Sequence, residues 1–186
     1  MTLSSVVLVL LQVYSLHRMA VAKPTCLLEG NMVQSAHHLL RDLGGPFPIL
    51  CLPYRANISF PDSAFPTAKA NHIQCRRALR VVYESLQGAE QVFEDHGLPV
   101  GGGGVTWDRE KLNRFRHLQH RLLEKGSCLS SVDSGVLPSY FSNVTAVLQQ
   151  QDSASCGWMS LKRDLLRVLE STLHHQPSCF TWRHAH

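Results

Sequence analysis

The side chains with the clearest chemical potential are six cysteines. They are Cys26, Cys51, Cys75, Cys128, Cys156 and Cys179. No two of them are separated by only two residues, so their spacing gives no support for a zinc ribbon or a thioredoxin-like redox motif. An even number of cysteines is typical of a protein that forms disulfides in an oxidising compartment. We therefore expect structural disulfide bonds and no thiol chemistry.

Eleven histidines form the second group, as possible ligands of a metal ion. The candidate pairs are His37 with His38, His117 with His120, His174 with His175, and His184 with His186. No HExxH or comparable ligand set is present, and neighbours on a helix point about 100° apart, so each pair would need a third ligand from elsewhere. We expect no metal and no cofactor. A secreted, histidine-based metal-binding protein is the alternative from a different functional class.

Catalytic motifs are also missing from the sequence. It contains no GxSxG nucleophile elbow, and residues 101–104, four consecutive glycines, are not followed by the Lys-Ser or Lys-Thr of a phosphate-binding loop. No acid, base and nucleophile constellation emerges from the remaining residues. The sequence therefore predicts that the chain is not an enzyme, and residues 101–104 are interpreted as a linker.

The leader and two glycosylation motifs indicate export. Residues 1–22 contain an apolar run from Val6 to Leu16 and end on Ala20-Val21-Ala22, the small-x-small pattern that signal peptidase recognises. This run is too short for a membrane span, which needs roughly 20 apolar residues, so we expect no membrane insertion and an extracellular, secreted domain over residues 23–186. Asn57 and Asn143 begin Asn-x-Ser and Asn-x-Thr sequons, which predict surface glycans.

The charge balance argues against nucleic acid as a partner. The chain has 18 Lys and Arg residues against 14 Asp and Glu, a net charge of +4, and loss of Arg18 with the leader leaves +3. The basic residues are spread along the sequence instead of forming a run, which is typical of a mixed, solvated surface.

Hydrophobic periodicity predicts an all-α domain of four long helices and one short helix, each of which buries its apolar face in a common core. The predicted helices cover about residues 27–43, 75–96, 106–125, 138–148 and 155–173, with Gly44-Gly45 as a positive-φ C-terminal cap and Thr106 as an N-cap. The clearest stripe is Cys75, Leu79, Val82, Leu86, Ala89 and Phe93, spaced 4, 3, 4, 3, 4. Phe115 and Trp158 lie on similar stripes, so we interpret both as core residues.

The connection after the first helix determines the topology. It contains several prolines and is about twenty residues long, enough to return the chain to its starting end, so the second helix runs parallel to the first. The result is an up-up-down-down helical cytokine bundle. In this bundle Cys51 and Cys156 share one end and must pair, because bridged Cα atoms lie within about 7 Å. The other four cysteines share the opposite end, where three pairings remain open.

Several motifs, in order along the chain, resemble those of the type I interferons, particularly those of fish. They are Cys51-Leu52-Pro53-Tyr54-Arg55 followed by Phe60-Pro61 and Phe65, Val81-Val82-Tyr83-Glu84, Trp107-Asp108 followed by Cys128, Tyr140-Phe141, and Cys156-Gly157-Trp158 before a basic amphipathic helix. The resemblance covers nearly the whole domain. It implies Cys26–Cys128 and Cys51–Cys156 bridges, and we expect Cys75 and Cys179, which have no counterpart in that framework, to form a third.

The resemblance also implies a function. Members of the family are monomers that join the two chains of a class II cytokine receptor and start antiviral signalling. Their high-affinity receptor chain is bound by the first loop and the exposed side of the last helix, and the matching positions here are Leu52, Arg55, Lys162 and Arg167. Another long-chain helical cytokine or hormone is the alternative within the class of binding proteins.

Overall fold

The computed structural model describes residues 26–55, 57–65, 72–99, 105–130, 135, 137–150 and 152–182. The predicted leader, the linker at residues 101–104, His184 and His186 lie outside these ranges. The α-helices are α2 (Gly30–Arg41), α3 (His72–His96), α4 (Arg109–Lys125), α5 (Leu137–Leu148) and α6 (Ala154–His175). Short 3-10 turns are η1 (Ile49–Arg55), η2 (Asp62–Ala64), η3 (Ser127–Leu129) and η4 (Pro177–Cys179). The described part of the chain contains no strand beyond one isolated bridge, and the predicted all-α class is confirmed.

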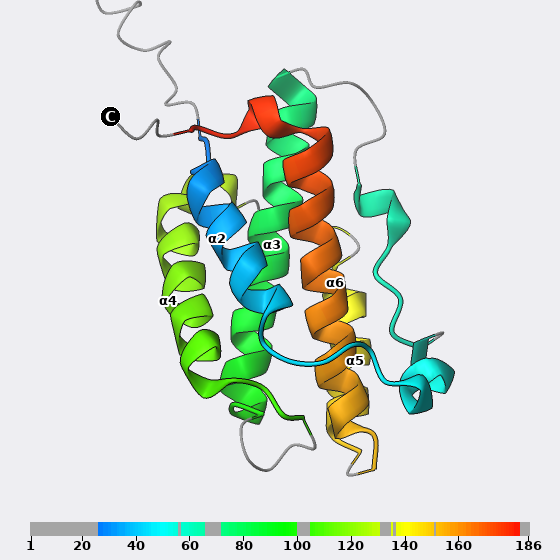
Figure 1. The fold of residues 1–186 in the computed structure, drawn as a ribbon. Coiled ribbons are helices and arrows are strands. Elements are labelled where there is room, and N and C mark those ends of the chain that lie inside the picture. The colour runs from blue at the N-terminus through cyan, green and yellow to red at the C-terminus, as the bar shows by residue number, and fades with distance from the viewer. Residues whose placement is uncertain are drawn as a thin grey trace, which may run out of the picture.

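Three disulfides join the ends of these helices. Cys26–Cys128 and Cys75–Cys179, with Cα atoms 5.9 and 5.0 Å apart, lie at the end where α2 and α3 begin and where α4 and α6 finish. Cys51–Cys156, at 5.2 Å, lies at the other end. These are the pairs that the sequence analysis expects. Figure 1 shows α2 and α3 running in one direction and α4 and α6 in the other, so the up-up-down-down arrangement is confirmed.

The core follows the predicted apolar stripes. Leu79, Val82, Leu86 and Ala89 of α3 are fully buried, as is Phe115 of α4. The ring of Phe93 stacks on that of Trp158 from α6, with centroids 5.5 Å apart and planes inclined by 7°. α5 packs between α3 and α6, and this places it behind α6 in Figure 1. The helix faces are therefore fixed by burial, as periodicity indicates.

Two predicted helix caps are wrong. Gly44 permits a close approach and does not supply a positive φ: an added Cβ would lie 3.1 Å from the Trp107 ring and 3.2 Å from the Thr106 carbonyl oxygen. Among the described glycines only Gly97 has positive φ, at 71°. The N-cap of α4 is Asp108 instead of Thr106, because the Asp108 carboxylate accepts the Lys111 backbone N–H at 2.9 Å.

The C-terminal tail is fastened to the start of α2. The Gly30 N–H donates to the Thr181 carbonyl oxygen at 2.8 Å, and the Thr181 N–H donates to that of Leu28 at 3.0 Å. The Trp182 ring lies so close to Gly30 that an added Cβ would be 2.7 Å from it, and the indole N–H donates to the Pro177 carbonyl oxygen. Together with the Cys75–Cys179 bridge, these contacts hold the tail against both parallel helices.

Candidate binding surface

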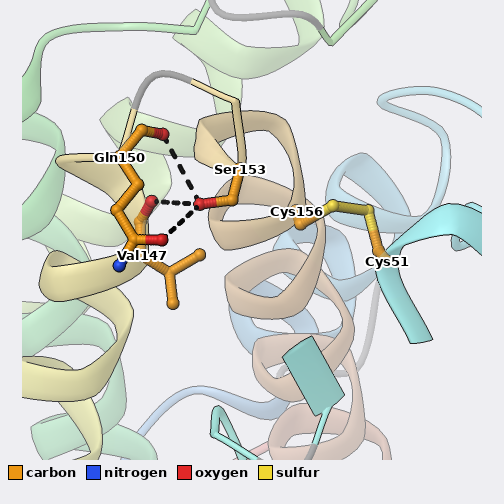
Figure 2. The surroundings of a disulfide bond; sticks show 5 residues. All are labelled: Cys51, Val147, Gln150, Ser153 and Cys156. Carbon is orange, nitrogen blue, oxygen red and sulfur yellow. Dashed lines mark hydrogen bonds between the residues drawn. A yellow bond between two sulfur atoms is a disulfide. The ribbon is translucent and has the colours of Figure 1, made fainter. Parts of the chain in front are cut away.

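The crossover between α2 and α3 is bonded covalently to the beginning of α6. Figure 2 shows Cys51 of η1 joined to Cys156, and beside them the turn that leads from α5 into α6. The Ser153 hydroxyl donates to the Val147 carbonyl oxygen at 3.0 Å and thereby ties this turn to the end of α5. The disulfide therefore attaches η1 to the start of α6, which the Ser153 hydrogen bond in turn ties to α5.

η1 presents large apolar side chains to solvent. Ile49, Leu50 and Leu52 are 83, 68 and 50% exposed, although each would gain free energy by burial. Leu52 is one of the four residues expected at the receptor surface. Ile49 and Leu50 were missed, because no helical or strand periodicity distinguishes an exposed apolar residue from a core residue in a proline-rich loop. Arg55 lies at the end of η1, and its side chain lies outside the described part of the structure.

Lys162 does not belong to an exposed face, and this expectation is wrong. The residue is only 6% exposed, and its Nζ atom donates hydrogen bonds to the carbonyl oxygens of Gly44 at 2.7 Å and Gly45 at 3.4 Å. Burial lowers the pKa of this amine, with the charge of Asp42 acting in the opposite direction. The physical reason is that the aliphatic stem of Lys162 packs along α6 while its head group satisfies the loop that follows α2.

Arg167 occupies the expected exposed position and contacts the crossover directly. Its guanidinium donates to the Asp62 carboxylate at 2.6 Å and lies 5.1 Å from the centroid of the Phe65 ring. The Arg167 side chain remains about half exposed, at 53%. Arg167 follows Cys156 by eleven residues, which corresponds to about 16 Å of helix. The surface is therefore extended along α6, with the η1 apolar residues at one end and Arg167 at the other.

Arg163 and Asp164 of α6 were not anticipated, and they fix the middle of the crossover. Arg163 donates to the Ile58 carbonyl oxygen at 3.1 Å and to Asp164 at 2.7 Å, and it lies over the Phe47 ring. The buried Asp164 accepts a hydrogen bond of 2.9 Å from the Tyr140 hydroxyl, whose pKa is raised well above its ordinary value by burial and by the charge of Asp164. An Arg-Asp pair on an amphipathic helix gives no sequence signal for such a network.

The space between α6 and the first part of the crossover is lined mainly by basic side chains, of which Arg41, Arg163 and Arg167 are paired with Asp42, Asp164 and Asp62. A cavity of about 610 Å³ is lined by Gly44 to Phe47 and by Met159, Leu166 and the basic residues Arg41, Lys162, Arg163 and Arg167. Glu170 is the one acidic residue of this lining among the residues that the structure describes. This recess combines apolar side chains with the aliphatic and guanidinium groups of paired arginines, so it is a mixed polar and apolar surface.

The asparagines of both glycosylation sequons lie on the surface. Asn57, just after η1, and Asn143, on α5, are both exposed. No helix in the described ranges is long and apolar enough to cross a bilayer.

A bundle in which α2 and α3 run in one direction and α4 and α6 in the other, with a long disulfide-anchored crossover, has the fold of a helical cytokine. Residues 28–176 match the family model of the interferon alpha/beta domain, and the chain therefore belongs to the type I interferon family. This is a family of cytokines and not of enzymes.

Individual relatives are consistent with this membership. Interferon alpha-G of Bos taurus is 27% identical over 151 residues, which cover 74% of this chain and 76% of the relative. Interferon alpha-1 of Sus scrofa is 25% identical over 150 residues, covering 74% and 75%. The solved structure of zebrafish interferon 2 has the same fold, with a TM-score of 0.61 and 24% identity, over 80% of this chain and 99% of that one.

Proposed function

We propose that the chain is exported after cleavage of residues 1–22 and acts as a monomeric extracellular cytokine. In this proposal it joins the two chains of a class II cytokine receptor and induces antiviral genes. One receptor chain binds the face formed by η1 and α6. The observation that carries the proposal is the exposure of Ile49, Leu50 and Leu52 on a segment that the Cys51–Cys156 bridge holds at one end of the α6 face that also carries Arg167.

The physical argument rests on rigidity and on the types of side chain. Contiguous exposed apolar residues are unfavourable in water and mark binding sites on soluble proteins. A segment fixed by a disulfide loses little conformational entropy when a partner binds, so more of the contact energy appears as affinity. Arginine remains charged and binds carboxylates in a bidentate fork, which makes Arg167, and Arg55 at the end of η1, suitable anchors for an acidic receptor surface.

Charge reversal on this face tests the proposal. Arg167→Glu, and more strongly Arg55→Glu with Arg167→Glu, should weaken binding to the receptor ectodomain by at least about 2 kcal/mol, the threshold for a hot spot. Surface plasmon resonance measures the affinity, and an antiviral reporter in receptor-bearing cells measures the response. Circular dichroism should be unchanged, because Arg167 and its partner Asp62 are both solvated.

The matched control reverses a charge elsewhere on the bundle. Arg76→Glu with Arg109→Glu changes the net charge equally at two exposed positions of α3 and α4. Equal losses of affinity in both double variants would mean that overall charge explains the effect. The proposal that the receptor binds η1 and α6 would then be contradicted. N-terminal sequencing of the secreted protein should begin at Lys23, and retention of the uncleaved chain in the cell would contradict export.

A further inference from the structure

α4 is rich in basic residues. Its basic residues are Arg109, Lys111, Arg114, Arg116, Arg121 and Lys125. Only Glu110 and Glu124 oppose them within the helix. The modest net charge of the chain, which argued against nucleic acid as a partner, therefore conceals a strongly basic helix.

A groove runs between this helix and α2. It encloses about 510 Å³ and is lined by Arg114, His117 and Arg121 of α4, by His38 of α2, and by the apolar Leu39 and Leu118. No acidic residue is part of this lining among the described residues. His38, Arg114, His117 and Arg121 are all exposed, so their hydrogen-bond donors are accessible from solvent.

The two arginines of the groove differ from the lysines at the ends of the helix. Lys125 is paired with Glu29, and Lys111 donates to the Asp42 carbonyl oxygen at 3.1 Å, so both tether α4 to the ends of α2. Within the described ranges, Arg114 and Arg121 form no ion pair. These guanidinium groups are therefore available to an external anion.

The spacing of these arginines indicates the shape of that anion. Arg114 and Arg121 are seven residues apart, which places them about 10 Å apart along α4 and within about 20° of one another around it. His117 lies between them, and His38 faces them from α2. Charged donors repeated along one open line suit a linear polymer with repeated anionic groups.

From this arrangement we infer that the α2/α4 groove binds a sulfated polysaccharide of the glycosaminoglycan class. Arginine binds the oxygens of an oxyanion such as sulfate in a bidentate fork, and imidazole N–H groups add further donors. Among the residues that the structure describes, the lining contains no Phe, Tyr or Trp on which nucleic acid bases could stack, whereas single-stranded nucleic acid sites usually rely on such rings. Figure 1 shows α4 on the opposite side of the bundle from η1 and η2, so the inference does not rest on the proposed receptor face.

Heparin affinity chromatography and surface plasmon resonance on immobilised heparin test the inference with the secreted protein. Arg114→Gln with Arg121→Gln should elute at lower salt and lose at least about tenfold in affinity. Release of condensed counterions makes binding to a linear polyanion salt-dependent, so losing two contacts should reduce the slope of log affinity against log salt by about one to two. The control, Arg76→Gln with Arg77→Gln, removes the same charge from two exposed positions of α3, away from α4, and should retain most of the affinity.

Comparing different polyanions distinguishes a sulfated polysaccharide from nucleic acid as the ligand of the groove. Desulfated heparin should bind far more weakly than heparin, because its sulfates are absent while the chain is retained. Equal binding of double-stranded DNA, equal losses in both double variants, or no binding to heparin at 0.15 M salt would overturn the inference. The antiviral reporter of the Arg114/Arg121 variant should match wild type in cells that lack sulfated polysaccharides, so failure of this inference is distinguishable from failure of the receptor proposal.

Discussion

The Nζ atom of Lys162 donates a hydrogen bond of 2.7 Å to the carbonyl oxygen of Gly44, a residue 118 positions earlier in the chain. This contact connects the middle of α6 to the loop that leaves α2. It supports the close approach of Gly44 to Trp107 and so lies at the point where three segments meet.

Replacement of Lys162 should therefore lower the stability of the bundle. Lys162→Met keeps most of the aliphatic stem but removes the donor, and it should lower the free energy of unfolding by about 1 kcal/mol because a partly buried hydrogen bond to the Gly44 carbonyl oxygen is lost. Urea unfolding measures this change. Arg167→Gln is the exposed control and should cost less than about 1 kcal/mol. Unchanged stability of Lys162→Met would show that the contact contributes nothing.

The third disulfide should contribute strongly to stability. Cys75 and Cys179 are 104 residues apart in sequence, but the Cys51–Cys156 bridge shortens the covalent path between them to roughly half. In the chain-entropy model, closure of a loop of that size contributes about 4 kcal/mol. Cys75→Ser with Cys179→Ser should lower the unfolding free energy toward that limit, and non-reducing peptide mapping should recover the pair in the wild-type protein. Recovery of both as free thiols would contradict the bridge.

Gly88 should tolerate no larger residue while Phe141 remains in place. A Cβ at Gly88 would lie 2.2 Å from the Phe141 ring, where α5 packs on α3. Gly88→Ala should cost about 1 to 3 kcal/mol from overpacking, reduced by about 1 kcal/mol of improved helix propensity. Combining it with Phe141→Leu should cost less than the sum of the two single changes, as thermal unfolding can measure. Strict additivity would mean that α5 shifts to relieve the contact.

His37 should make the bundle sensitive to acid. Burial lowers the pKa of this imidazole, while Glu170 raises it and His38 and Arg41 lower it further. The folded state therefore binds fewer protons than the unfolded chain just below the ordinary histidine pKa, and stability falls as the pH drops from about 6.5 toward the folded pKa. The stability advantage of wild type over His37→Gln should shrink between pH 7.5 and pH 5. His38→Gln, an exposed neighbour, is the control, and a constant difference for His37→Gln would contradict this linkage.

Both sequons should be available for glycosylation. Asn57 and Asn143 are exposed, and Asn143 lies on α5 next to the buried Val144. Asn57→Gln and Asn143→Gln should each lower the apparent mass of the secreted protein on a gel, and enzymatic deglycosylation should remove the difference. A mass that changes only for Asn57→Gln would show that the helical sequon is not used.

Periodicity and helix length predict the features of this fold that depend only on position along a helix. The α3 stripe predicts its own buried face, and the length of the bundle separates Cys51 and Cys156 from the other cysteines. Lys162 was misplaced because its partner is a backbone carbonyl far away in sequence, for which side-chain patterns contain no information. The basic α2/α4 groove was missed for a related reason, since residues seven apart on α4 join with His38 only after the helices have packed.

The hydrogen bond between Gly30 and Thr181 couples the start of α2 to the C-terminal tail, so that the two should open together. The first turn of α2 has no side-chain cap from Glu29, and the Gly30 amide instead donates to Thr181. A helix whose first amide is satisfied by a distant segment frays when that segment detaches. Solvent exchange at the amides of Gly30 and Thr181 should therefore report one shared opening event, which makes the beginning of α2 and the last residues of the tail a single cooperative unit.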